Sequence, residues 1–130
     1  MINAVLDTNV IVSGLLTEQG NSAFIIDAFK ENQFNLIYNG EILAEYHDVL
    51  YRDKLGLPAG DIDELLEQIK YAGYPIIPAI SSISLTDEDD RIFYDTAKAA
   101  NAYLVTGNTK HYPQEQFIIL PVDFTVLLKS

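Results

Sequence analysis

Cysteine is absent from this chain, and its absence excludes disulfides and thiolate metal sites alike. Any bound metal would have to be held by carboxylates, amides, hydroxyls or the two histidines. Oxygen ligands of these kinds suit Mg²⁺ or Mn²⁺ better than zinc.

Long apolar runs are also absent. No stretch approaches the roughly 20 apolar residues of a membrane helix, and the first residues lack the basic flank and apolar run of a signal peptide. We therefore expect a cytoplasmic chain with no membrane association. Its 130 residues and 48% hydrophobic content predict one domain, residues 1–130, with a single core.

Positive charge is scarce, because 8 Lys+Arg stand against 19 Asp+Glu and give a formal net charge of −11. Such a charge opposes binding of RNA or DNA by simple neutralisation of phosphates. The cations are also dispersed, since only Arg52 and Lys54 lie close together in the sequence. A nucleic-acid partner must therefore be inferred from a specific site.

What is present is an alternation of short β-rich runs with helical patterns, which is typical of an α/β protein with a parallel sheet. Strands are expected at residues 2–6, 34–38, 74–77, 103–106 and 117–120. Helices are expected at residues 22–31, 41–52, 61–72 and 89–100. The functional crevice of an open parallel sheet lies beyond the carboxyl ends of its strands, where Asp7 and Asn108 fall.

Asp7 ends the first expected strand directly after an apolar run. A carboxylate at the end of a strand buried on both faces is costly unless its charge is compensated, and a metal ion would compensate it. The alternative is that Asp7 turns the chain and caps a short helix beginning near Val10.

Glu45 lies beside an apolar stripe of the expected helix 41–52, between Ile42 and Val49. It is too far from Arg52 along the helix for a direct local ion pair. We predict that Glu45 faces the site, and the alternative is a partly exposed helix glutamate.

Four consecutive acids, Asp87, Glu88, Asp89 and Asp90, precede the expected helix 89–100. A helix start explains one or two of them, at about 0.3–1 kcal/mol each, through capping and the helix dipole. Four adjacent like charges repel one another unless a cation relieves them. We predict that Asp87 and Glu88 serve capping and solvation, that Asp90 points inward toward a metal, and that Asp89 can do either.

Three blocks of sequence follow one another along nearly the whole chain: Leu-Asp-Thr-Asn-Val at residues 6–10, Ile-Leu-Ala-Glu-Tyr at 42–46, and Asp-Asp-Arg-Ile-Phe at 89–93 followed by Ala-Tyr-Leu-Val-Thr-Gly-Asn at 102–108. Together, and in this order, they resemble the PIN domain family. More narrowly, Val-Thr-Gly-Asn-x-Lys-His-Tyr-Pro at 105–113 is similar to a bacterial and archaeal branch labelled as toxin components of toxin-antitoxin pairs.

The resemblance implies a three-layer α/β/α sandwich with a central five-stranded, mainly parallel sheet, and a Mg²⁺- or Mn²⁺-dependent nuclease that hydrolyses RNA. The acidic set of the family falls on Asp7, Glu45 and Asp90. Its usual fourth acid is Asn108 here, which removes a negative charge from the metal site. Asn9 and Thr106 match polar positions that line the family's site.

The same resemblance implies an RNA substrate and a cognate antitoxin protein, and we expect the chain to form a homodimer. Lys110 and His111 follow the site loop and are candidates for contact with phosphate, although both also fit ordinary exposed loop positions. The rival hypothesis is not enzymatic: a PIN-like module that binds proteins, catalytically weak because its fourth acid is lost.

Overall fold

The computed structural model describes all 130 residues. Its centre is a five-stranded sheet in the order β3-β2-β1-β4-β5. The strands are β1 (Asn3–Leu6), β2 (Asn35–Tyr38), β3 (Tyr74–Pro75), β4 (Tyr103–Val105) and β5 (Ile118–Ile119). All four pairings are parallel, so the predicted five-stranded parallel sheet is confirmed.

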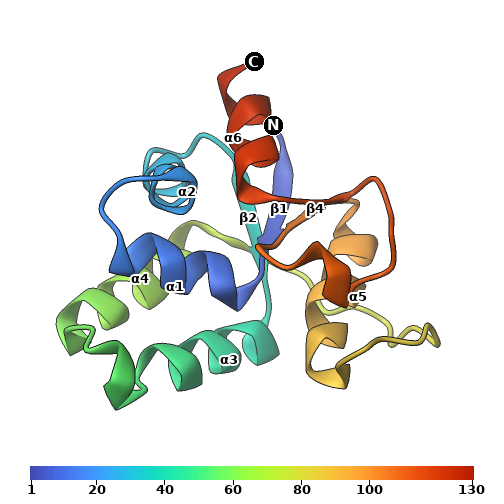
Figure 1. Cartoon of the computed structure of the whole chain (residues 1–130), viewed down its shortest axis with the longest axis horizontal. Coiled ribbons are helices and arrows are strands. Elements are labelled where there is room, and N and C mark those ends of the chain that lie inside the picture. The colour runs from blue at the N-terminus through green and yellow to red at the C-terminus, as the bar shows by residue number, and fades with distance from the viewer.

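Helices cover both faces of the sheet and complete three layers. In Figure 1 the helices α1 to α4 lie on one side of the strands, α5 lies on the other, and α6 lies near the N-terminus. They are α1 (Thr8–Leu16), α2 (Asn21–Lys30), α3 (Gly40–Leu50), α4 (Ala59–Ala72), α5 (Arg91–Ala100) and α6 (Pro121–Lys129). The expected α/β/α sandwich is therefore confirmed, and no helix has the length and apolar character needed to cross a bilayer.

The sequence-based boundaries need correction mainly at the edges of the sheet. The strands expected at 74–77 and 117–120 are each only two residues long, because β3 and β5 are edge strands with one neighbour each and Pro75 has no N–H to donate. The helix expected from residue 89 begins with a 3₁₀ turn, η2 (Glu88–Asp90), before α5. Helix α6 was not predicted, although Pro121 in its first turn is a typical start signal. Helix α1 entered the predictions only as the short helix in the capping alternative for Asp7.

The core forms around β1, the central strand. Ala4, Val5 and Leu6 have no exposed surface, so β1 is buried on both faces as predicted. On one face α1 approaches α2 very closely at Gly14. A Cβ at this position would lie 2.3 Å from Ile26 Cδ1 and 2.9 Å from the Ser22 carbonyl oxygen, so only glycine permits this packing of α1.

The connections of the sheet change direction between β1 and β4. β1 leads to β2 on one side, whereas its neighbour on the other side is β4, and Leu6 pairs in register with Val105. The next residues, Asp7 and Thr106, therefore leave the sheet side by side at its carboxyl edge. This is the position at which open α/β sheets form their binding crevices.

Candidate functional site

Asp7 is fixed at the carboxyl end of β1 by its neighbour β4. Its backbone N–H donates to the Val105 carbonyl at 2.9 Å. Its Oδ2 accepts hydrogen bonds from Thr106 Oγ1 at 2.9 Å and from the Tyr112 hydroxyl at 2.8 Å. Asp7 does occupy the N-cap position of α1, but its side chain makes no capping bond, so the capping alternative is wrong for the carboxylate.

Burial dominates the chemistry of this carboxyl group. The Asp7 residue is 7% exposed, and burial raises the pKa of its carboxyl group although the bonds from Tyr112 and Thr106 act in the opposite direction. Burial, followed by the charges of Asp7 and Asp90, raises the pKa of Tyr112 in turn, so its hydroxyl stays protonated and donates. Sequence reasoning missed Tyr112, because an aromatic residue in a loop gives no signal that it will contact an aspartate.

Thr106 organises the loop that follows β4. Besides donating to Asp7, its Oγ1 accepts from Asn9 Nδ2 at 3.3 Å and from the Asn108 backbone N–H at 3.0 Å. Asn9 Oδ1 accepts from the Gly107 N–H at 2.9 Å. The side chains of Thr106 and Asn9 thus lie at the site as predicted, but they are engaged in holding it together. Asn108 is half-buried beside them.

Glu45 reaches the same region from α3. It is half-buried, and its Oε2 accepts a hydrogen bond from Thr8 Oγ1 at 3.3 Å. Thr8 is the residue that directly follows Asp7 in the chain. The next residue, Tyr46, is fully buried and donates its hydroxyl to the Leu6 carbonyl at 2.5 Å. The bond from Tyr46 anchors α3 to the end of β1, and Glu45 is placed beside the start of α1 as a consequence.

Asp90 points inward from the end of η2, as predicted. Its Oδ2 is buried and has no hydrogen-bond partner, and Nδ1 of the His111 ring lies 3.6 Å from it. Burial raises the pKa of Asp90 to about 6, and the negative charge of Asp7 adds to the rise. Asp90 and Asp7 therefore lie near enough to repel each other.

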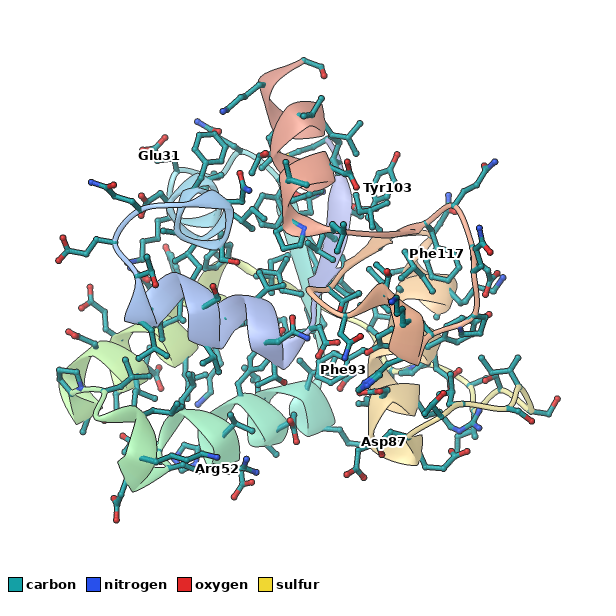
Figure 2. All side chains as sticks on the ribbon, in the orientation of Figure 1. Glu31, Arg52, Asp87, Phe93, Tyr103 and Phe117 are labelled. Carbon is teal, nitrogen blue, oxygen red and sulfur yellow. The ribbon has the colours of Figure 1, made fainter.

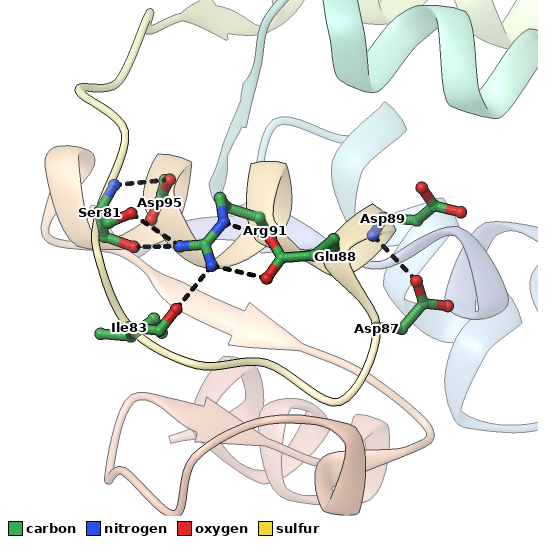
Figure 3. A network of polar contacts seen from close by, with 7 residues as sticks. All are labelled: Ser81, Ile83, Asp87, Glu88, Asp89, Arg91 and Asp95. Carbon is green, nitrogen blue, oxygen red and sulfur yellow. Dashed lines mark hydrogen bonds and ion pairs between the residues drawn. The ribbon is translucent and has the colours of Figure 1, made fainter.

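The neighbouring acids have other partners (Figure 3). Asp87 caps the turn by accepting from the Asp89 N–H at 2.9 Å. The Glu88 carboxylate forms a bidentate ion pair with Arg91, accepting from Nε at 2.6 Å and from Nη2 at 2.9 Å. These hydrogen bonds lower the pKa of Glu88. The capping role predicted for Asp87 is confirmed. Asp89 is exposed and points away from Arg91.

Arg91 also holds the segment that crosses the start of α5, residues 76–87, which we call the strap. Its guanidinium donates to the Ser81 carbonyl at 2.8 Å and to the Ile83 carbonyl at 2.6 Å. Asp95, one turn further along α5, accepts from the Ser81 N–H at 3.1 Å. Sequence reasoning treated Arg91 as one of several dispersed cations and missed this role.

The oxygen atoms at this site are of the chemical type that binds a divalent cation, but the side chains do not surround a position for one. No three Asp, Glu or His side chains stand together as a group that could hold a metal ion. Asp7 and Asp90 nevertheless offer two mutually repelling carboxylates, and one oxygen of Asp90 is buried without any donor. Hard oxygens of this kind suit Mg²⁺ or Mn²⁺. The metal-binding roles of Asp7, Glu45, Asp90 and Asn108 stay predictions.

Lys110 and His111 lie in the short 3₁₀ turn η3 (Thr109–His111), and both side chains are exposed. Although exposed, the His111 ring has its Nδ1 3.6 Å from Oδ2 of Asp90. Contact of either residue with substrate phosphate stays a prediction.

A family model described as PIN domain matches residues 3–110. No curated protein and no solved structure matches the chain. The matched residues include most of the chain, with Asp7, Glu45, Asp90 and Asn108 among them. The chain belongs to the PIN domain family, whose members are generally nucleases that use divalent metal ions.

Proposed function

We propose that this PIN domain is an endoribonuclease that depends on Mg²⁺ or Mn²⁺ and hydrolyses phosphodiester bonds of single-stranded RNA. The observation that carries the proposal is the pair of inward-facing carboxylates, Asp7 and Asp90, at the point where the sheet connections change direction. Membership of the family supports nuclease activity. RNA as the substrate is supported by the resemblance of the sequence blocks.

The residues of the chain have separable tasks in this reaction. Asp7 and Asp90 would hold the metal with Glu45, and Asn108 would contribute an amide oxygen. The bound ion would lower the pKa of a water molecule and neutralise charge on the phosphoryl oxygens. Thr106 and Tyr112 both donate to Oδ2 of Asp7, so they fix its orientation and leave Oδ1 for a ligand.

Removing either inward carboxylate tests the proposal. We expect Asp7→Asn to abolish Mn²⁺-dependent cleavage of single-stranded RNA and Asp90→Asn to reduce it strongly. The loss should exceed the roughly 10- to 100-fold cost of losing a residue that only supports a metal ligand. Circular dichroism would establish that each repurified variant is folded.

Asp89→Asn is the matched control, because it removes the same charge from an exposed side chain on the same turn. We expect it to cleave at nearly the wild-type rate. An Asp7→Asn protein that cleaves as fast as wild type would refute the assignment of the site.

The non-enzymatic alternative also has an observation in its favour. A cleft of about 620 Å³ lies between α3, the strap and α5, and it combines acidic side chains with the exposed apolar residues Ile77 and Ile80. Such a surface suits a protein partner. If the wild-type chain cleaves no RNA at any Mn²⁺ concentration, a protein-binding PIN-like module becomes the better account.

We propose further that the physiological role is that of a toxin controlled by an antitoxin protein, with a homodimer as the assembly. The support for this role is the resemblance of residues 105–113 to toxin components.

A further inference from the structure

Two hollows of opposite character meet at Glu45. The acidic cleft described above lies on one side of it, lined among others by Glu41, Glu45, Glu88, Asp89 and Asp95. On the other side a groove of about 590 Å³ runs between α1 and α3, and we call it the α1/α3 groove. Its lining includes Thr8, Asn9, Ser13, Glu45, Arg52 and Lys54.

The two hollows differ in the positive charge that they offer to a polyanion. Arg52 and Lys54, the only two cations close together in the sequence, both line the α1/α3 groove. The one cation in the acidic cleft, Arg91, is already bonded to Glu88 and to carbonyl groups of the strap. An RNA strand leaving the site would be repelled on the cleft side and attracted on the groove side.

The geometry of the groove suits a short length of nucleic acid. Helices α1 and α3 lie side by side, and Arg52 lies just beyond the end of α3 that is remote from Asp87 (Figures 1 and 2). From Glu45 to Leu50, where α3 ends, the helix rises by about 7.5 Å, which is the axial rise of about two nucleotides in one strand of a duplex, and Arg52 lies beyond that end. Polar side chains of Asn9 and Ser13 line the space between them.

Arg52 is available to a phosphate because its present partner holds it weakly. It pairs with Asp48 at 3.3 Å, and the two side chains are 51% and 74% exposed. Exposed pairs of this kind contribute little stability and are readily exchanged. A guanidinium is also the side-chain group best shaped to bind a phosphate with two parallel hydrogen bonds.

We propose that the α1/α3 groove binds the RNA strand on one side of the scissile bond, with phosphates on Arg52 and Lys54, while the acidic cleft stays free of RNA. The inference rests on the proposed ribonuclease function and adds to it the path of the substrate. It also accounts for how a chain with a net charge of −11 holds a polyanion: the attraction is confined to one groove.

Binding and cleavage of a fluorescent single-stranded oligoribonucleotide test the path. In an Asp7→Asn background, which prevents cleavage, we compare Arg52→Gln/Lys54→Gln with the matched control Lys30→Gln/Lys129→Gln. Both pairs change the net charge equally, and neither Lys30 nor Lys129 lines the groove. Affinity for RNA falls as salt rises, and losing two phosphate contacts should make the plot of log affinity against log salt less steep by about 1.4. Raising the salt from 50 to 200 mM should therefore weaken binding by a factor about sevenfold smaller in the groove variant than in the control.

Cleavage kinetics, and a variant expected to strengthen RNA binding, complete the test. With Asp7 intact, Arg52→Gln/Lys54→Gln should raise KM and leave kcat nearly unchanged. Asp48→Asn should tighten RNA binding, because it removes the carboxylate that pairs with Arg52. An unchanged salt slope and KM in the groove variant, with normal cleavage, would overturn the proposed path and leave the ribonuclease function standing. A wild-type chain that neither binds nor cleaves the RNA would overturn both.

Discussion

The Asp90 carboxylate is the group in the site whose charge is least compensated. One oxygen is buried without a donor, the charge of Asp7 acts on it, and its pKa is raised to about 6 from an ordinary value of 3.8. A shift of this size corresponds to at most about 3 kcal/mol, and screening by solvent around a half-buried group reduces it to about 1 kcal/mol. Without metal, the ionised Asp90 therefore destabilises the folded chain.

We expect metal-free Asp90→Asn to melt about 3–5 °C higher than metal-free wild type at pH 7, because about 1 kcal/mol shifts the melting temperature of a domain of this size by that amount. The pH dependence has a definite sign. Since the folded-state pKa is raised, the stabilising effect of protonating Asp90 is complete below about pH 4 and is lost as pH rises through about 6. The advantage of the variant should therefore shrink on acidification from pH 7 to pH 5.

Calorimetry of both proteins in chelator across this pH range measures the effect. Asp89→Asn serves as the control, because its side chain is exposed and we expect little change in its melting temperature. If metal-free Asp90→Asn melts several degrees below wild type, the Asp90 carboxylate is stabilised by internal contacts and its assignment as a metal ligand fails.

For single residues, the sequence predicted the positions of the carboxylates better than it predicted the hydrogen-bond donors that orient them. Asp7 and Asp90 were placed correctly, because a carboxylate that follows a buried strand or shares a face with apolar residues has few directions in which to point. Tyr112 and the hydroxyl of Thr106 could not be assigned as partners of Asp7, because these bonds join residues about 100 positions apart and depend on the path of one loop.

At the scale of elements, side chains of α5 hold the middle of the strap, at Ser81 and Ile83. It has no regular secondary structure before η2. Its residues Ser81 and Ile83 are hydrogen-bonded to Arg91 and Asp95, and the Arg91 side chain is only 19% exposed. Because Arg91 follows Asp90 directly in the chain, the same anchor also fixes the start of α5 and the direction of Asp90.

We expect Arg91→Met, which keeps much of the apolar stem and removes the donors, to release the strap. Each carbonyl left without a partner costs about 1–3 kcal/mol if it stays buried, so the strap should open instead. Hydrogen exchange at the Ser81 amide should accelerate, while amides of β1 keep their protection. The control is Arg52→Met, which removes an exposed arginine and should leave exchange at Ser81 unchanged. Equal protection of the strap in wild type and Arg91→Met would show that other contacts hold it.

Elements with strong periodicity were predicted well, and those defined by their neighbours were not. The central strands β1, β2 and β4 agree with the sequence-based ranges to within one residue at each end. The edge strands β3 and β5 are shorter than their apolar runs, because pairing with a single neighbour ends before the run does. The path of the strap cannot be read from local pattern, since it depends on tertiary bonds to Arg91.

At the scale of the whole molecule, the excess of negative charge couples folding to cations. A net charge of −11 produces self-repulsion, and the inward carboxylates Asp7 and Asp90 concentrate part of it at the edge of the sheet. An ion that binds the folded chain and not the unfolded chain stabilises it in proportion to the logarithm of its concentration above Kd. Mn²⁺ should therefore raise the melting temperature more than NaCl at the same ionic strength.

We expect Asn108 to set the strength of this coupling. An amide oxygen can ligate a cation but lacks the charge that holds a hard divalent ion tightly, so we expect one weak site with a Kd on the order of millimolar. Asn108→Asp adds a carboxylate beside Thr106, so the metal-free protein should melt lower and the Mn²⁺-saturated protein higher than the corresponding wild-type forms. Calorimetric titration should also give a lower Kd for Mn²⁺, and cleavage should need less metal. Thr109→Asp, which adds the same charge one residue further along, controls for general attraction of cations. Equal Mn²⁺ affinity and stoichiometry in wild type and Asn108→Asp would show that residue 108 does not face the ion.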